Sequence, residues 1–170
     1  LRYKSHSVTD GKYSIPGLPA VYADKADGAY TVEVVLEDTL LGLEVTLRYG
    51  VLPELDVITR SVIVKNIGKH QIYLTKVYSA GMDFLTGDFD LLHFHGRHAM
   101  ERMEERIPVI YGNQSFGSRR GTSSHQQNPF FILAEKETTE DFGVCYGMSM
   151  LYSGNFKCEV EKDQFGQTRM

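Results

Sequence analysis

A chain of 170 residues is long enough to bury a hydrophobic core, and 42% hydrophobic with 24% charged residues is an ordinary composition for a globular protein. The formal net charge is −4 and the 18 Lys and Arg residues are dispersed, so we expect no nucleic-acid partner. No apolar run reaches the roughly 20 residues of a membrane-spanning helix, so we expect no membrane partner. Two cysteines, Cys145 and Cys158, are too few for a disulfide framework and favour a reducing, cytoplasmic location, with a single bridge as the alternative.

Alternating hydrophobic and polar residues dominate the chain. Leu43, Val45 and Leu47 face one way and Glu44 and Thr46 the other, which is the period-two pattern of a half-buried strand. Similar runs rich in β-branched and aromatic residues predict seven strands, at 30–36, 43–49, 57–66, 72–78, 130–134, 144–152 and 157–160. Turn signals separate them, at 15–17, 27–28, 38–42, 66–69, 140–143 and 153–155. These short connections predict an all-β fold with antiparallel strands, including a tight hairpin at 66–69.

Two stretches interrupt the alternation. Residues 98–106 carry a helical pattern, but Pro108 limits its length, and a helix of about nine residues is marginal, so we expect a turn or an extended segment over a sheet edge. Residues 112–128 are rich in Gly, Ser, Arg, Gln and Asn and predict a long ordered loop held by polar contacts.

Three histidines form the most conspicuous cluster of candidate metal ligands. His93 and His95 would share one strand face, with His98 nearby. A zinc site also needs a fourth ligand and groups that orient the imidazoles, and the sequence indicates neither. We therefore expect solvated or hydrogen-bonded imidazoles, no metal here, and no cofactor elsewhere in the chain.

No catalytic group can be nominated from spacing alone. Ser124 and His125 are adjacent but belong to no G-x-S-x-G motif, so we expect no hydrolase triad. The charged run at 101–106 is typical of a solvated face of salt bridges. The alternative is that Arg102 and Arg106 pair with carboxylates of another domain.

The segment from Gly117 to Phe130, GSRRGTSSHQQNPF, resembles the N-terminal domain of glycoside hydrolase family 36 α-galactosidases. Shorter stretches extend the resemblance over essentially the whole chain: LRYKSH at 1–6, GLPA at 17–20, GLEVTL at 42–47, DVITRS at 56–61, YSGNF at 152–156 and DQF at 163–165. A match that keeps this order and spacing is not expected by chance.

The resemblance implies that residues 1–170 form one large antiparallel β-sandwich, a supersandwich of the galactose mutarotase-like type. Family members are retaining enzymes that remove terminal α-galactose from sugars such as melibiose and raffinose, using two aspartates on a (β/α)₈ barrel that follows in the polypeptide. The chain is then expected to be a fragment of the N-terminal domain of a longer bacterial enzyme, with that barrel absent. The resemblance implies no catalytic or substrate-binding residue in this chain, and two kinds of partner: the barrel of the same polypeptide, and other copies in a homo-oligomer, a tetramer in the family.

The loop within this segment concentrates hydrogen-bond donors that a simple cap on a sandwich would not need. We expect it to face the barrel or a neighbouring subunit through Arg119, Arg120, His125, Gln126, Gln127 and Asn128, with bracing of its own domain as the alternative. A different class of function also stays open, a stand-alone carbohydrate-binding sandwich that stacks sugars on aromatic rings. With 10 Tyr and 9 Phe but no Trp, such a platform would be atypical.

Overall fold

The computed structural model describes residues 1–85, 87–152 and 154–170. Its regular structure is almost entirely strand, and the paired strands of the described residues are antiparallel, which confirms the predicted all-β fold. Of the turn expected at 153–155, Ser153 lies outside the described residues. The chain divides into two compact units, a first unit (Leu1–Ala80) and a second unit (Gly81–Met170).

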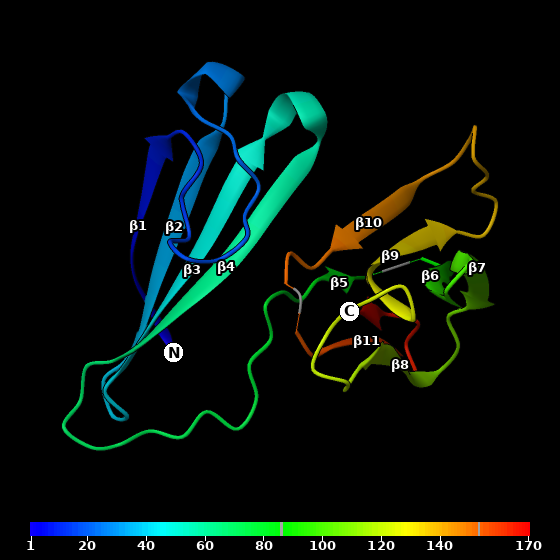
Figure 1. Ribbon diagram of the computed structural model, residues 1–170. Helices are drawn as coiled ribbons and strands as arrows, with labels where there is room; N and C mark the ends of the chain where they lie inside the picture. The colour runs from blue at the N-terminus through cyan, green and yellow to red at the C-terminus, as the bar shows by residue number, and fades with distance from the viewer. Residues whose placement is uncertain (86, 153) are drawn as a thin grey trace. The chain divides into compact units, whose positions relative to one another are not determined.

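The first unit is built on a four-stranded antiparallel sheet (Figure 1). Its strands lie side by side in chain order: β1 (Arg2–Asp10), β2 (Tyr30–Asp38), β3 (Leu43–Leu52) and β4 (Val57–Asn66). The β2–β3 hairpin closes at the predicted turn, where one carboxylate oxygen of Asp38 accepts the backbone N–H groups of Leu40 and Leu41. Gly42 ends this turn with a φ of +66°, which a residue with a side chain rarely adopts. The 3₁₀ helix η2 (Pro53–Leu55) connects β3 to β4.

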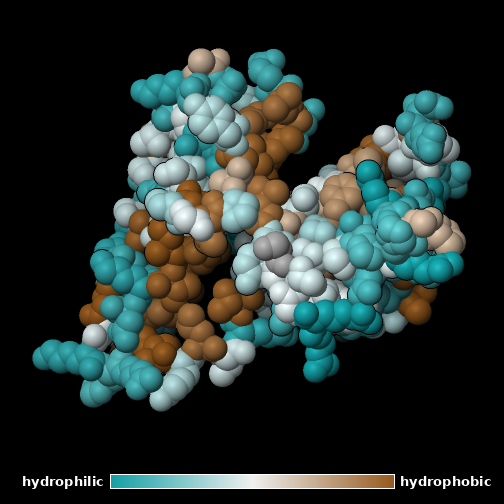
Figure 2. Space-filling model, viewed as in Figure 1, coloured by the Kyte–Doolittle hydropathy of each residue, from teal (hydrophilic) through white to brown (hydrophobic). Residues whose placement is uncertain are grey.

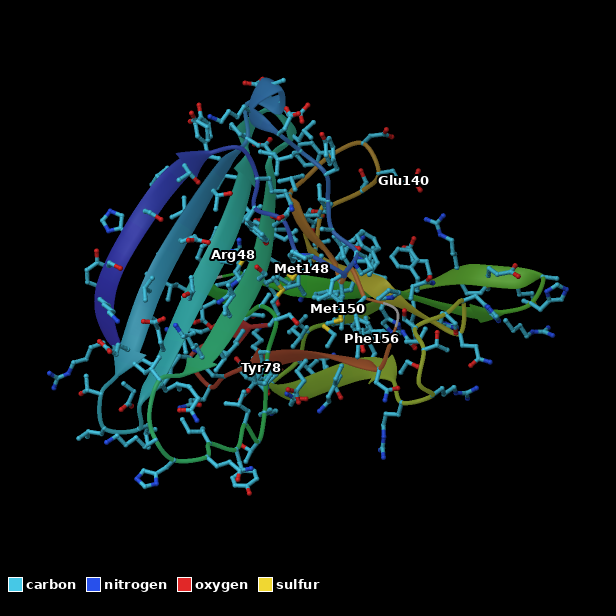
Figure 3. All side chains as sticks on the ribbon, turned by 60° about the vertical axis from the view of Figure 1, so that its left-hand side comes forward. Arg48, Tyr78, Glu140, Met148, Met150 and Phe156 are labelled. Atoms are coloured by element: carbon cyan, nitrogen blue, oxygen red, sulfur yellow. The ribbon has the colours of Figure 1, made fainter. Side chains whose placement is uncertain are left out.

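The connection from β1 to β2 lies against this sheet instead of forming a tight hairpin. It contains the 3₁₀ helix η1 (Lys25–Asp27). Tyr13 in the same connection is buried, with the guanidinium of Arg48 on β3 4.6 Å from its ring centroid, and Figure 3 labels Arg48 on the sheet. The unit buries few side chains: Ala23, Ala29 and Leu52 form one small cluster, and Val45 of β3 is also buried.

The second unit contains two four-stranded sheets. One has the order β10-β9-β6-β7, formed by β6 (Phe89–Arg97), β7 (Met100–Pro108), β9 (Gln127–Glu135) and β10 (Cys145–Ser149). The other has the order β5-β12-β11-β8, formed by β5 (Asp83–Phe84), β8 (Gly112–Ser118), β11 (Phe156–Lys162) and β12 (Thr168–Arg169). Leu91 of β6, Leu133 of β9 and Val160 of β11 meet in one buried cluster, so the two sheets share a core as a small sandwich.

The structure corrects two predictions in the first unit. Residues 72–78 form no strand, and residues 66–69 form no hairpin. The backbone N–H groups of Ile67 and Gly68 instead donate to the carbonyl of Gly42, at 2.8 and 3.0 Å, so the chain turns back against the β2–β3 hairpin. The residues at 72–78 have strand-forming composition, but a strand needs a neighbour to pair with.

Other elements differ from the sequence prediction in extent. Residues 100–108 form an extended edge strand, as expected for this region. The long loop expected at 112–128 is shorter, because 112–118 belong to β8 and 127–128 to β9. The alternation did not reveal β1, because every residue of this strand is exposed and neither of its faces has to be apolar. None of the described helices has the length and hydrophobicity needed to cross a lipid bilayer.

Candidate functional site

The six residues expected at an interface lie on the 119–126 loop and the start of β9, and they divide into two groups. Gln127 and Asn128 are half-buried, and their side-chain amides donate to the backbone carbonyl of Phe94 at 3.5 and 3.3 Å. The Gln127 amide also lies 3.4 Å from Nδ1 of His93. These two side chains therefore brace their own sheet.

The other four, Arg119, Arg120, His125 and Gln126, are exposed. Arg120 Nη1 donates to Gln126 Oε1 at 2.5 Å, which joins the two ends of the loop. Among the described residues, the side chains of Arg119 and His125 have no hydrogen-bond or ion-pair partner. The loop thus presents positive charge and free donors to its surroundings.

The loop is ordered by groups that the sequence did not single out. Ser118 Oγ donates to the carbonyl of Thr122 at 2.6 Å, and Asn155 Oδ1 accepts the backbone N–H of Gly121 at 2.6 Å. Serine and asparagine commonly make such bonds to backbone groups in turns. The contact from Asn155 spans 34 positions of sequence, so no local pattern could have indicated it.

The histidine cluster centres on one carboxylate. Nε2 of His93 and Nε2 of His95 lie 3.4 and 3.7 Å from the same Oε2 of Glu105 on β7, whereas His98 lies in the β6–β7 turn. The His93 ring stacks on Phe116 of the opposite sheet, with 5.1 Å between centroids. Burial lowers the pKa of His93, and the Glu105 carboxylate opposes this. The part of the chain that the structure describes contains no group of three His, Cys, Asp or Glu side chains arranged to hold a metal ion.

Arg106 fixes the β9–β10 hairpin. Its Nε donates to Asp90 Oδ2 at 2.7 Å, Nη1 to the carbonyl of Thr138 at 2.8 Å, and Nη2 to the carbonyls of Lys136 and Glu135 at 2.9 and 3.3 Å. A planar guanidinium with five N–H donors can reach these four acceptor oxygens at once. All four acceptors lie in its own unit, so this guanidinium braces the second unit.

The remaining candidates for nucleophilic chemistry have ordinary roles. Ser124 Oγ accepts the backbone N–H of Gln126 at 3.2 Å, as in a turn. Both cysteines are free, Cys145 exposed and Cys158 half-buried. Burial raises the pKa of the Cys158 thiol to about 12, which keeps it protonated and unreactive at neutral pH.

Comparison with known proteins places this geometry in a family. The family model for the glycosyl hydrolase family 36 N-terminal domain matches residues 1–170. The bifunctional alpha-galactosidase/sucrose kinase AgaSK of Mediterraneibacter gnavus is 58% identical over all 170 residues, which make up 18% of that protein. A fungal relative, alpha-galactosidase C of Emericella nidulans, is 43% identical over 99% of the chain and 22% of its own length.

Solved structures agree with the sequence matches. The crystal structure of the alpha-galactosidase AgaA from Geobacillus stearothermophilus is 46% identical and superposes with a TM-score of 0.95, over 99% of this chain and 23% of that one. This chain therefore spans about a fifth of the length of the relatives it matches. The resemblance noted in the sequence is confirmed, and the chain belongs to the N-terminal domain family of glycosyl hydrolase family 36.

Proposed function

We propose that this chain is the non-catalytic scaffold and assembly domain of a retaining α-galactosidase, here called the parent enzyme, that hydrolyses terminal α-galactosides of the melibiose and raffinose type. The observation that carries the proposal is the match of the whole chain to the N-terminal domain of proteins named as alpha-galactosidases. A variant of the relative AgaA has been crystallised in complex with raffinose, which supports this class of substrate.

Three carboxyl groups of the chain have pKa shifts opposite to the one that a catalytic general acid needs. Retaining glycosidases need two carboxyls about 5 Å apart, one of which acts as a general acid with a raised pKa. The structure shifts the pKa of Glu44, Asp83 and Asp88 in the opposite direction. A hydrogen bond from Lys4 lowers the pKa of Glu44, and one from Arg169 lowers that of Asp83. Hydrogen bonds from Lys136 and Lys162 lower the pKa of Asp88. These three groups stay ionised near neutral pH and cannot donate a proton to a leaving group.

The surface of the first unit supports a role in holding other parts of the parent enzyme. Figure 2 shows hydrophobic side chains gathered over this unit. Ile58 and Ile63 of β4 and Tyr73, Leu74 and Val77 of the following segment are all exposed. Ile58 and Ile63 lie on opposite faces of β4, and exposed apolar side chains that gather on a surface mark a contact region. We take the catalytic barrel of the same polypeptide as its partner.

The exposed part of the 119–126 loop supports an assembly role in the second unit. Arg119, Arg120, His125 and Gln126 point away from the sandwich, whereas Gln127 and Asn128 hold it together. We therefore place the interface on the first four residues. The free thiols of Cys145 and Cys158 support a reducing compartment, the cytoplasm, for the parent enzyme.

The experiment is to incubate the 170-residue chain at high concentration with p-nitrophenyl α-galactoside, beside the parent enzyme. We expect the parent to release p-nitrophenol and the chain to release none, because both catalytic carboxyls lie on the barrel. Turnover by the chain that a point substitution within it abolishes would refute the non-catalytic role. Saturable binding of galactose by the chain, measured by calorimetry, would favour the carbohydrate-binding alternative.

A further inference from the structure

The two edges of the β10-β9-β6-β7 sheet differ in how they are protected. The β7 edge carries charged side chains along its length, has Arg102 at a φ of +59°, contains a register shift opposite β6, and ends at Pro108. These are the devices by which natural edge strands avoid pairing with another chain. β10, the sequence CYGMS, has no charge, no proline and no register shift against β9. Within the second unit, one edge of this sheet is therefore protected against pairing with a further strand, and the other edge is not.

The open edge offers unpaired backbone groups. In the β9–β10 ladder, the backbone N–H of Glu135 donates to the carbonyl of Val144, and that of Met150 to the carbonyl of Pro129. Because alternate residues of an antiparallel strand point to opposite sides, the N–H and C=O groups of 145, 147 and 149 point away from β9. Their side chains are those of Cys145, Gly147 and Ser149, which are small and exposed. A second strand can therefore approach this edge closely.

One end of the β9–β10 ribbon is an acidic tip, defined as residues 137–142. Glu137, Glu140 and Asp141 are exposed, and no ion pair recorded for the described residues involves them. Phe142 beside them is 76% exposed. Figure 3 labels Glu140 at the end of this hairpin and Met148 and Met150 toward its other end.

The acidic tip is rigid although it is exposed. The backbone N–H of Thr139 donates to the carbonyl of Phe142 at 2.7 Å, and Arg106 holds the carbonyl of Thr138 from the neighbouring strand. Gly143 has a φ of +110° and no room for a side chain beside Thr138. Because the backbone around Phe142 is held by these bonds, its exposed ring projects from a defined position, which favours binding as an anchor.

The opposite end of the same ribbon is a basic platform, defined as Arg119, Arg120, His125, Leu151 and Tyr152. Leu151 and Tyr152 are large exposed hydrophobic residues that follow β10. Ser123 Oγ donates to the carbonyl of Tyr152 at 3.2 Å, which ties the loop to these residues. The platform thus joins positive charge to an apolar surface, and the acidic tip joins negative charge to an apolar ring.

We propose that β10 pairs antiparallel with β10 of a second copy of this chain, about a two-fold axis close to Gly147. An antiparallel arrangement places the acidic tip of each copy on the basic platform of the other, so the contact forms twice and closes. Backbone hydrogen bonds between the strands supply the pairing, and the opposite charges at both ends set its direction and register. Phe142 then meets Leu151 and Tyr152 of the second copy.

This inference deepens the assembly part of the proposed function by naming the surface and the occupant. It does not depend on the chemistry of the parent enzyme. A monomeric chain that is also inactive on galactosides would overturn the dimer and leave the non-catalytic role standing. A dimeric chain that hydrolyses galactosides would overturn the non-catalytic role and leave the dimer standing.

Charge reversal tests the contact by sedimentation velocity. We expect a tip variant, Glu140→Lys with Asp141→Lys, and a platform variant, Arg119→Glu with Arg120→Glu, each to weaken dimerisation about tenfold or more, because both contacts become repulsive. Mixing the two variants should restore a heterodimer, since each contact then again joins opposite charges. A control matched to the tip variant, Glu54→Lys with Glu104→Lys, makes the same change of net charge outside the contact and should dimerise like the unmodified chain.

A cross-link tests the register. With the axis at Gly147, Cys145 of one copy lies opposite position 149 of the other, so Ser149→Cys should form an intermolecular disulfide with the native thiol on mild oxidation. The same substitution combined with Cys145→Ser should not. The same two variants made in the parent enzyme show whether the β10 edge is free to pair in the longer polypeptide.

The proposal is overturned if the chain stays monomeric at all concentrations, or if the mixed variants fail to pair while circular dichroism shows both folded. It is also overturned if the cross-link forms in the isolated chain and not in the parent enzyme, because another part of that polypeptide would then cover β10.

Discussion

Both units are built from antiparallel strands, but they bury very different numbers of side chains. In the second unit, two sheets face each other, and Leu133 and Val160 are fully buried between them. In the first unit, a single sheet has a small cluster of three buried residues, and every residue of β1 is exposed. The comparison teaches that antiparallel pairing alone makes a sheet, whereas a stable hydrophobic core requires a second layer.

The largest expected effect comes from shortening one apolar side chain in each unit, a buried one in the second unit and an exposed one in the first. Leu133→Ala should lower the free energy of unfolding of the second unit by about 2–5 kcal/mol, because a fully buried leucine leaves a cavity. Ile63→Ala on the exposed side of β4 should cost less than about 1 kcal/mol, because its side chain is already 46% exposed. Urea denaturation followed by a probe in each unit measures both. Equal losses would mean that Ile63 is packed as tightly as Leu133, which would contradict the difference drawn between the two units.

A smaller effect is expected from loosening the acidic tip. Arg106→Lys keeps the charge but cannot reach Asp90 and three carbonyls at once, so it should lower the free energy of unfolding by about 1–2 kcal/mol. It should also open the hairpin to proteolysis at 136–144. Arg97→Lys at the end of β6 is a control for the loss of a guanidinium group. Unchanged cleavage of the hairpin would show that the backbone bonds of the tip suffice.

Near neutral pH, a pH effect on stability is expected from His93 in the second unit. Burial lowers the pKa of His93 below that of the unfolded chain, so the unfolded state takes up the proton first as the pH falls. Stability should be constant above the unfolded pKa of about 6.5, fall as the pH drops through it, and level off below the folded pKa. His93→Gln should flatten this decline in the urea midpoint. A decline of the same size in the variant would assign the pH dependence to other groups.

The smallest effect separates the two groups of loop residues. Gln127→Ala removes the donation to the carbonyl of Phe94 and should lower stability by about 0.5–1.5 kcal/mol. Arg119→Ala removes an exposed side chain and should change stability by less than about 0.5 kcal/mol. Thermal unfolding of the two variants decides the point. A larger loss for Arg119→Ala would mean that this arginine braces its own unit.

The sequence predicted the parts of the fold that depend on local pattern. Strands with one buried face, such as β3, alternate visibly, and Asp38 to Gly42 was recognisable as a turn. β1 escaped because both its faces are exposed, and residues 72–78 were misassigned because their composition says nothing of whether a neighbouring strand exists.

For the candidate site too, local composition was predictable from the sequence and contacts between distant residues were not. The concentration of donors at 119–128 was visible, but which side chains turn inward depended on the carbonyl of Phe94, some 33 positions earlier in the chain. The acidic tip and the open edge of β10 depend on sheet order, since the same five residues in a central strand would offer nothing to a partner.

The most direct test of the central claim, that the chain is a scaffold and not a catalyst, is to separate it from the rest of the parent enzyme and recombine the two. We expect the chain alone to release no p-nitrophenol, the remaining polypeptide alone to be poorly folded and weakly active, and their mixture to recover α-galactosidase activity as the two associate. Full activity and stability of the remaining polypeptide without the chain, unchanged when the chain is added, would contradict this account.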